Sequence, residues 1–200
     1  MKRIGVFGGT FNPPHIGHGR LVEHIRQTVQ LDRLLVIPTF LPPHKVSNDL
    51  ASCEDRLAMC RLAFPNWCEV SDLEIRRGGK SYTVDTLTQL KAAYPNDELV
   101  LLIGSDMMQT FDQWVRCEDI LQMCTVCVTS RADEGLDLSA DKIPAIFEKH
   151  PFLRSDLPPF EVSSTQIRQR IRQGEDTAGL LLPEVRSFIE KRGLYRGSDL

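Results

Sequence analysis

The chain has 200 residues, of which 42% are apolar, and carries 24 Lys and Arg against 27 Asp and Glu, a formal charge of −3. This composition is typical of a globular protein, excludes disorder, collagen and coiled coil, and argues against a protein that coats nucleic acid, because such binding needs many cationic contacts to phosphate. No apolar run reaches the roughly 18–20 residues of a membrane span, and the residues between Met1 and Gly8 are too few for a secretory signal.

Short, nearly continuous apolar runs alternate with segments of helical spacing. Such runs are typical of parallel strands that helices cover on both faces. Strands alternating with helices predict an α/β fold, a Rossmann-like doubly wound parallel sheet. The predicted strands are Ile4–Phe7, Leu34–Ile37, Leu99–Ile103 and Thr125–Thr129, with a weaker one near Glu69–Leu73. The predicted helices carry apolar residues at Leu21/Ile25/Val29, Leu57/Cys60/Phe64 and Val84/Leu87/Leu90.

The last third of the chain has a different pattern. Residues 132–159 have no firm periodicity and carry Pro, Asp and Lys, which predicts an irregular surface excursion. Val162–Gly174 and Pro183–Arg192 are predicted helices. We therefore expect one domain over residues 1–200, with a small helical C-terminal lobe from about residue 160.

The six cysteines suggest either a disulfide scaffold or free thiols. A chain of this length builds a core without disulfides, which favours free thiols and a cytoplasmic protein. Cys124 and Cys127 form a C-x-x-C within an apolar run that predicts a strand. Because residues three apart in a strand face opposite sides, we expect both in the core rather than on one metal.

The segment Gly8–His18 follows the first predicted strand, and ligands of open α/β sheets bind outside the carboxyl ends of strands. Adjacent glycines let backbone N–H groups approach an anion, and the helix that follows presents its positive end. His15 and His18, three residues apart at the predicted helix start, share a face and can both donate to phosphate oxygens. The segment therefore predicts a phosphate-binding loop.

Other interpretations of this loop remain open. The glycines can serve a tight turn, and the histidines can be a surface helix cap or a zinc pair, although zinc lacks a third ligand nearby in the sequence. The dinucleotide fingerprint G-x-G-x-x-G is absent. Gly79-Lys80-Ser81 does not complete a P-loop, because Glu74 stands where that motif requires glycine.

A second cluster begins at Ser163. Ser163-x-x-Gln166 predicts a capping box, and a capped helix start is also an anion site. Arg168, one turn further, can clamp phosphates with its guanidinium fork. The alternative for Arg168 is an exposed helix face shared with Arg172.

Asp106 follows the predicted strand Leu99–Ile103, with Gly104 between them. A carboxylate at the end of a strand can accept hydrogen bonds from ribose hydroxyls, and the glycine allows close approach. The alternative is a helix N-cap.

Taken in order, the motifs resemble bacterial nicotinate-nucleotide adenylyltransferases, which belong to the nucleotidyltransferase superfamily. His-Ile-Gly-His also occurs in class I aminoacyl-tRNA synthetases, but 200 residues leave no room for their tRNA-binding parts, and Lys-Met-Ser-Lys-Ser is absent. The motifs are His15-Ile16-Gly17-His18, Pro42-Pro43-His44-Lys45, Glu74-Ile75-Arg76-Arg77, Ser81-Tyr82-Thr83-x-x-Thr86-Leu87, Ile103-Gly104-Ser105-Asp106, Trp114, Ser163-Ser164-Thr165-x-x-Arg168 and Gly193-Leu194-Tyr195-Arg196.

The resemblance implies attack by the 5′-phosphate of nicotinate mononucleotide on the α-phosphorus of ATP, giving deamido-NAD and pyrophosphate without a covalent enzyme intermediate. It implies three groups of residues. The catalytic group is His15, His18 and Arg168; the ATP-binding group is Gly8, Gly9, Thr10, Phe11, Gly104, Asp106, Arg131, Ser163, Ser164 and Thr165; the mononucleotide-binding group is Lys45, Thr83, Trp114 and Val115. Mg²⁺ is expected to arrive with ATP, since no dedicated metal site is visible in the sequence.

Three positions depart from the family pattern. Arg131-Ala132-Asp133 replaces Arg-Pro-Gly, Val115 replaces a larger side chain, and Asn12 replaces Asp, an exchange for which no chemical penalty is expected. A tryptophan such as Trp114 is more often a core residue than a ligand platform, so its role depends on the resemblance.

Two alternatives to this function are kept. Pantetheine-phosphate adenylyltransferase shares the histidine and Ser-Ser-Thr-x-x-Arg elements, and a nucleotide-sensing module would bind ATP without turnover. The partners expected are small molecules, with no nucleic acid and no membrane; the oligomeric state is left open.

Overall fold

The structure, a computed structural model, describes residues 1–42, 49–131, 143–157 and 162–197. Six parallel strands form one sheet in the order β3-β2-β1-β4-β5-β6, which is the Rossmann order. The strands are β1 (Arg3–Gly9), β2 (Arg33–Pro38), β3 (Cys68–Val70), β4 (Glu98–Gly104), β5 (Thr125–Arg131) and β6 (Leu153–Leu157). The helices are α1 (Ile16–Val29), α2 (Cys53–Ala63), α3 (Leu73–Arg77), α4 (Thr83–Ala93), α5 (Ser105–Met108), α6 (Cys117–Met123), α7 (Ser164–Gln173) and α8 (Pro183–Arg192), with 3₁₀ turns η1 (Phe111–Gln113) and η4 (Ala145–Glu148).

The strands are apolar on both sides because helices cover both faces of the sheet. Val6 packs with α4 and α6, whereas its neighbour Phe7 packs with α1 and α2. Leu101 and Leu102 of β4 divide in the same way. Successive residues of a strand point to opposite faces, so a sheet buried on both faces needs continuous apolar runs.

β1 and β4 are neighbours in space, although two other strands separate them in sequence. Strand addition changes direction at this pair, so the connections that leave β1 and β4 diverge and open a crevice at the carboxyl edge. The predicted segments that follow Gly9 and Gly104 therefore adjoin the position where such sheets bind ligands.

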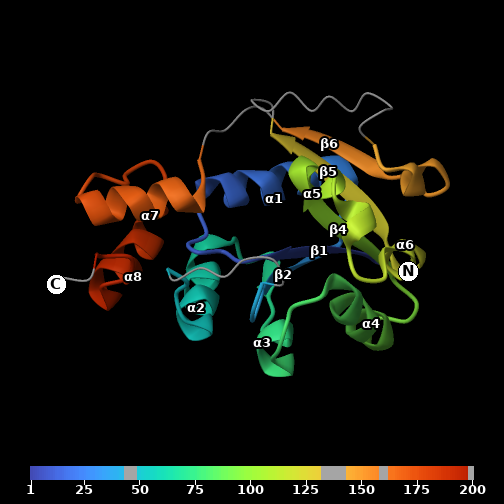
Figure 1. Cartoon of the computed structure of the whole chain (residues 1–200), viewed down its shortest axis with the longest axis horizontal. Coiled ribbons are helices and arrows are strands. Elements are labelled where there is room, and N and C mark those ends of the chain that lie inside the picture. Colours follow the sequence, from blue (N-terminus) through green and yellow to red (C-terminus); the bar gives the residue numbers. More distant parts are fainter. Residues whose placement is uncertain (43–48, 132–142, 158–161, 198–200) are drawn as a thin grey trace.

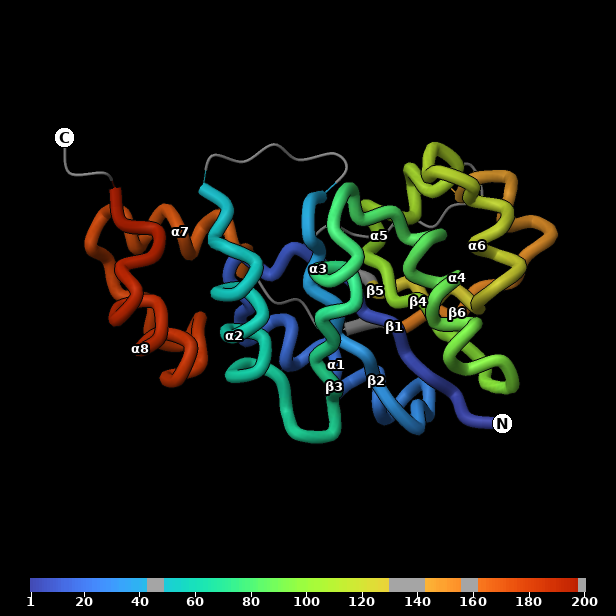
Figure 2. Tube along the Cα trace, turned by 90° about the horizontal axis from the view of Figure 1, so that it is seen from below, coloured from blue at the N-terminus to red at the C-terminus, as the bar shows by residue number. Residues whose placement is uncertain are grey.

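The two C-terminal helices lie together at one end of the molecule, beside α2 (Figures 1 and 2). Their apolar side chains form a cluster of their own, in which Ile167 of α7 and Val185 and Ile189 of α8 pack with Met59 of α2. The prediction of a helical C-terminal lobe is confirmed, and α8 has the predicted bounds.

Two strand predictions need correction. The weak strand near Glu69–Leu73 is β3 over Cys68–Val70, and Leu73 begins α3 instead. Within the predicted surface excursion, β6 pairs in parallel with β5. Its sequence Leu-Arg-Ser-Asp-Leu has a polar centre because β6 is an edge strand, so apolar patterning did not reveal it. Residues 132–142 and 158–159 of that excursion lie outside the described part.

All six cysteines are free. Cys127 packs on the α1 and α2 face and Cys124 against the α4 and α6 face, which confirms that the C-x-x-C pair points to opposite sides of the sheet. Burial raises the pKa of Cys127 to about 11, as expected for inert core thiols. Of the helices in the described ranges, none combines the length and apolarity of a membrane span.

Candidate active site

The loop after β1 is held by its carbonyl groups. The carbonyl of Gly9 accepts from Thr39 N at 2.9 Å, beside β2. Phe11 has a φ of +48° and is buried, and a Cβ on Gly9 would lie 2.9 Å from its ring. Glycine is therefore required at position 9 for close packing, whereas the space beside Gly8 is open.

His15 and His18 lie together where this loop enters α1, with ring centroids 3.7 Å apart. His15 is the N-cap of α1, as the interpretation of a surface helix cap expects. It is buried, however, so the expectation that it lies on the surface is wrong. Nδ1 of His18 accepts from the backbone N–H of His15 at 3.0 Å. An accepting Nδ1 on a neutral imidazole places the hydrogen on Nε2, so His18 presents Nε2 as a donor.

Gly17, between the two histidines, permits this arrangement. A Cβ at Gly17 would lie 3.0 Å from Nδ1 of His15 and 3.0 Å from Cγ1 of Val162. Val162 immediately precedes the predicted capping box, so the close approach at Gly17 brings two distant segments of the chain together.

The start of α7 is bonded to the same loop. Ser163 accepts from Gln166 N at 3.2 Å and donates its own backbone N–H to Gln166 Oε1 at 3.0 Å, which confirms the capping box. The hydroxyl of Ser164 donates to Pro13 O at 2.8 Å, and Nη1 of Arg168 donates to Asn12 O at 2.8 Å.

Arg168 is therefore half-buried against the loop. The alternative of an exposed face shared with Arg172 is wrong for Arg168, because Arg168 donates to Asn12 O and its Nε is buried. Arg172 is exposed and pairs with Asp49. Thr165 accepts a longer bond from Nη2 of Arg168, at 3.4 Å.

The side chain of Asn12 joins three segments. Its Nδ2 donates to Asp49 O at 2.9 Å, and its Oδ1 accepts from Ala51 N at 3.0 Å and from the hydroxyl of Tyr195 at 2.8 Å. A carboxylate could not donate to Asp49 O. The expectation that Asn and Asp are equivalent at position 12 is therefore wrong for this contact.

Gly104 and Asp106 end β4 and begin α5. The N-cap is Gly104, and Asp106 lies in the first turn with an exposed side chain, so the N-cap interpretation of Asp106 is wrong. A Cβ on Gly104 would lie 2.5 Å from Oδ1 of Asp106. The carboxylate is thus turned back over the end of the strand.

Thr83, Trp114 and Val115 lie near the α4 and α6 face of the sheet. Thr83 is the first residue of α4. The ring of Trp114 stacks on Phe111, with centroids 5.0 Å apart, and packs against the core. The face of the indole toward Phe111 is therefore part of the core packing. Val115 is 47% exposed.

Of the predicted site residues, one lies outside the described structure and another is described only in its backbone. Lys45 lies outside the described residues. Arg131 is the last residue of β5, and its backbone pairs with Leu157 of β6, but its side chain lies outside the description.

Two charged groups near these elements are buried, Glu74 and Arg56, and the apolar pattern predicts burial of neither, although Glu74 belongs to one of the family motifs. Glu74 accepts from Thr86 Oγ1 at 2.6 Å, which ties α3 to α4. Arg56 of α2 is wholly buried and donates to Thr10 O at 3.0 Å. A charged residue within an amphipathic helix normally indicates its solvent side, so only the contacts identify these two.

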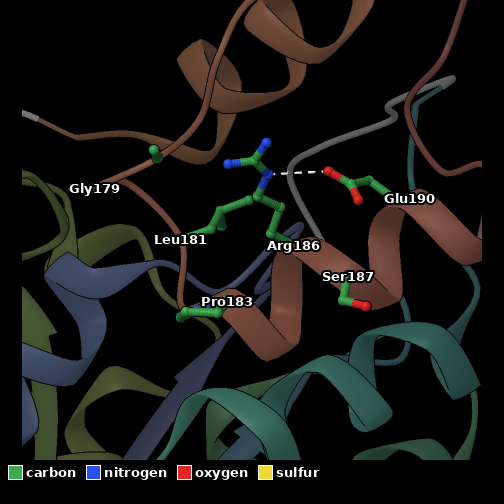
Figure 3. Close-up of a pocket in the computed structure, with 7 residues that line it drawn as sticks. Gly179, Leu181, Pro183, Arg186, Ser187 and Glu190 are labelled. Carbon is green, nitrogen blue, oxygen red and sulfur yellow. Dashed lines mark hydrogen bonds and ion pairs between the residues drawn. The ribbon is translucent and has the colours of Figure 1, made fainter.

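Two hollows lie outside the predicted site, although Ile16, which lines the second, belongs to the segment Gly8–His18. One of about 320 Å³ is in the C-terminal lobe, where Arg186 is already paired with Glu190 (Figure 3). Arg186 also pairs with Asp176. Another of about 480 Å³ lies along α1. The first is lined by Ala178, Gly179, Leu181, Pro183, Arg186, Ser187 and Glu190, the second by Ile16, Gly19, Arg20, Glu23, His24, Gln27, Ala63 and Leu182. Neither is lined by a predicted site residue. Over the described ranges, no group of three or more His, Cys, Asp or Glu could hold a metal ion.

Comparison with known proteins agrees with the geometry. Residues 6–170 match the model of the cytidylyltransferase-like family. The nicotinate-nucleotide adenylyltransferase of Bacillus subtilis is 35% identical over 98% of this chain and 99% of its own length. A probable nicotinate-nucleotide adenylyltransferase of Desulfitobacterium hafniense is 40% identical over 98% of this chain and 96% of its own length.

The solved structures show the same fold. The nicotinic acid mononucleotide adenylyltransferase of Plasmodium falciparum, complexed with NaAD, has a TM-score of 0.80 at 20% identity and covers 98% of each chain. A putative nicotinate-nucleotide adenylyltransferase from Vibrio parahaemolyticus has a TM-score of 0.70 at 22% identity and covers 99% of this chain and 98% of its own.

Proposed function

This chain belongs to the cytidylyltransferase-like family, and on that premise we propose that it is a nicotinate-nucleotide adenylyltransferase of NAD biosynthesis. A phosphate oxygen of nicotinate mononucleotide forms a bond to the α-phosphorus of ATP. The bond from that phosphorus to the oxygen bridging to the β-phosphate breaks, and pyrophosphate leaves. The observation that carries the proposal is the 2.8 Å hydrogen bond from Arg168 to Asn12 O, which joins α7 to the segment Gly8–His18.

Phosphoryl transfer of this kind depends on positioning and on stabilising charge. We assign His15 and His18 to the α-phosphate, where Nε2 of His18 donates as negative charge develops. The Gly8–Phe11 amides approach the phosphates from the same loop. The support is the tautomer that the His15 N–H imposes on His18, and the open space beside Gly8.

Arg168 is assigned to the leaving pyrophosphate. Its Nε is buried without a hydrogen-bond acceptor in the described residues, so a phosphate oxygen would supply a missing partner. Ser163, Ser164 and Thr165 form the start of α7, whose positive end favours the same anion.

The remaining assignments follow the family resemblance. Thr83, Trp114 and Val115 are assigned to the nicotinate ring, with the indole face opposite Phe111 as the stacking surface. Lys45 is assigned to the mononucleotide phosphate. Gly104 and Asp106 are assigned to ATP ribose contacts, and Arg131 to the adenine side. Gly104 and Asp106 follow β4 directly, and β4 is the neighbour of β1, so the two nucleotides would meet across the carboxyl edge.

The substrates are small molecules, and ATP is expected to enter with Mg²⁺ held by its own phosphates and water. We place the reaction in the cytoplasm, with the six free thiols as support.

Pyrophosphate release from MgATP tests the function when nicotinate mononucleotide, nicotinamide mononucleotide and phosphopantetheine are compared as acceptors. We expect the highest kcat/KM with nicotinate mononucleotide. Preference for phosphopantetheine would support the pantetheine-phosphate alternative. ATP binding with no turnover on any acceptor would support a sensing module, and either result would overturn the proposal.

A further inference from the structure

Arg56 is a cation held inside the protein by neutral acceptors. Its side chain has no exposed surface. Nε donates to Ala51 O at 3.1 Å, Nη1 to Thr10 O at 3.0 Å, and Nη2 to Phe40 O and to Cys53 Sγ, both at 3.2 Å. All of its assigned partners are therefore carbonyl groups and a thiol.

Its neighbour Asp55 does not neutralise it by direct contact. The carboxylate of Asp55 accepts from Arg192 Nε at 2.9 Å and from Ser52 Oγ at 2.9 Å. In the described part of the chain, no carboxylate forms an ion pair with Arg56. Burying a charge without an opposite partner costs free energy. A negative charge bound near this guanidinium would therefore be stabilised by it.

The hydrogen bonds of the loop carbonyls fix the directions of the backbone N–H groups that follow them. Because the Thr10 carbonyl points at Arg56, the N–H of Phe11 in the same planar trans peptide points the other way. The Gly9 carbonyl is likewise bonded to Thr39 N, so the N–H of Thr10 points away from β2. The contacts of the Thr10 and Gly9 carbonyls thus fix the directions of the N–H groups of Phe11 and Thr10.

We propose that Arg56 is an electrostatic positioning residue for the phosphates of ATP, acting through the Thr10–Phe11 peptide without touching the substrate. A cation on the carbonyl polarises the peptide and strengthens its N–H as a donor. The triphosphate supplies the negative charge that Arg56 lacks within the protein. This inference rests on the proposed function, because it requires phosphate binding at the loop.

Two variants separate the effect of the positive charge on ligand binding from the effect of the side-chain shape: Arg56→Met removes the charge, and Arg56→Lys keeps it. Calorimetry gives the Kd of each variant for pyrophosphate, which is anionic, and for adenosine, which is neutral. A unit charge about 10 Å from a single negative charge, at an effective dielectric constant of about 20, changes a binding constant by at least about tenfold, and pyrophosphate carries more than one such charge. We expect Arg56→Met to weaken pyrophosphate at least about tenfold and leave adenosine within about twofold, and Arg56→Lys to bind both ligands within about threefold of the parent.

Arg186→Met is the control, because Arg186 is a half-buried arginine of the C-terminal lobe that pairs with Asp176 and Glu190, outside the site. It should leave both Kd values unchanged. Equal weakening of pyrophosphate and adenosine in Arg56→Met would show a structural role only and overturn the inference. Loss of pyrophosphate binding in Arg56→Lys would also overturn it. If Arg56→Met does not fold, the neutral variant Arg56→Gln takes its place in the comparison with Arg56→Lys, with the same expected and contrary results. Failure of the parent protein to turn over nicotinate mononucleotide would instead refute the proposed function.

Discussion

In the proposed function the two nitrogens of His18 have different roles, and substitutions can test these roles separately. Nδ1 accepts from His15 N at 3.0 Å and so caps α1, whereas Nε2 is the donor assigned to the α-phosphate. The amide oxygen of asparagine stands as many bonds from Cβ as Nδ1, and the amide nitrogen of glutamine as many as Nε2. His18→Asn therefore keeps the cap and removes the donor. His18→Gln keeps both, because a glutamine at the third position of a helix accepts from the N-cap N–H, as Gln166 does in α7.

The expected magnitudes follow from these contacts. Removing a donor that acts in the transition state costs about 3–4 kcal/mol, so kcat of His18→Asn should fall about 100- to 1000-fold. Its unfolding free energy should stay within about 0.5 kcal/mol of the parent. His18→Gln should keep its unfolding free energy within about 0.5 kcal/mol of the parent and keep more of its turnover than His18→Asn. His18→Ala loses both nitrogens and should lose both turnover and about 1 kcal/mol of stability through the cap.

The assays are pyrophosphate release under saturating substrates and urea unfolding followed by circular dichroism. A His18→Asn enzyme with near-normal kcat would refute the role of Nε2. A His18→Asn enzyme that loses turnover only because it unfolds would show a midpoint shift in urea as large as that of His18→Ala.

Further predictions address the arginine, the Asn12 contact, the pH dependence and the metal. Arg168→Lys loses the guanidinium fork, so steady-state kinetics should show the KM for ATP rising about tenfold and that for nicotinate mononucleotide less than about threefold; equal rises would contradict the assignment. Tyr195→Phe removes one of two bonds to Asn12 Oδ1 and should lower the unfolding free energy in urea by about 1 kcal/mol; an unchanged midpoint would show that this bond contributes nothing. Burial raises the pKa of Cys127 from its ordinary value near 9 to about 11. The folded protein thus holds this proton more tightly than the unfolded chain, so its contribution is complete below pH 9 and decreases up to pH 11, by about 2 kcal/mol. Urea titrations at pH 8 and 10.5 should show a smaller loss in Cys127→Ala than in the parent, and identical losses would refute this account. Calorimetry without nucleotide should detect no micromolar Mg²⁺ site, while turnover should stop in EDTA and return with excess Mg²⁺; a tight site in the free protein would contradict delivery of the metal with ATP.

Local patterns predicted the parts of this protein that depend on local physics. The strands β1, β2, β4 and β5 were predictable because burial on both faces requires continuous apolar residues. The capping box at Ser163 was predictable because both of its bonds lie within one helical turn. The order of motifs then identified the residues of the candidate site, without indicating how they contact one another.

Contacts between distant segments were decided only by the tertiary structure. β6 is held by pairing with β5, so its polar sequence contains little trace of the strand. Arg56 and Tyr195 are ordinary residues in sequence, yet both bond to the loop that follows β1. Arg168 meets that loop across 156 residues. A periodicity records which side of an element is buried, but the atoms that meet there are set by how the elements pack, and that depends on the whole chain at once.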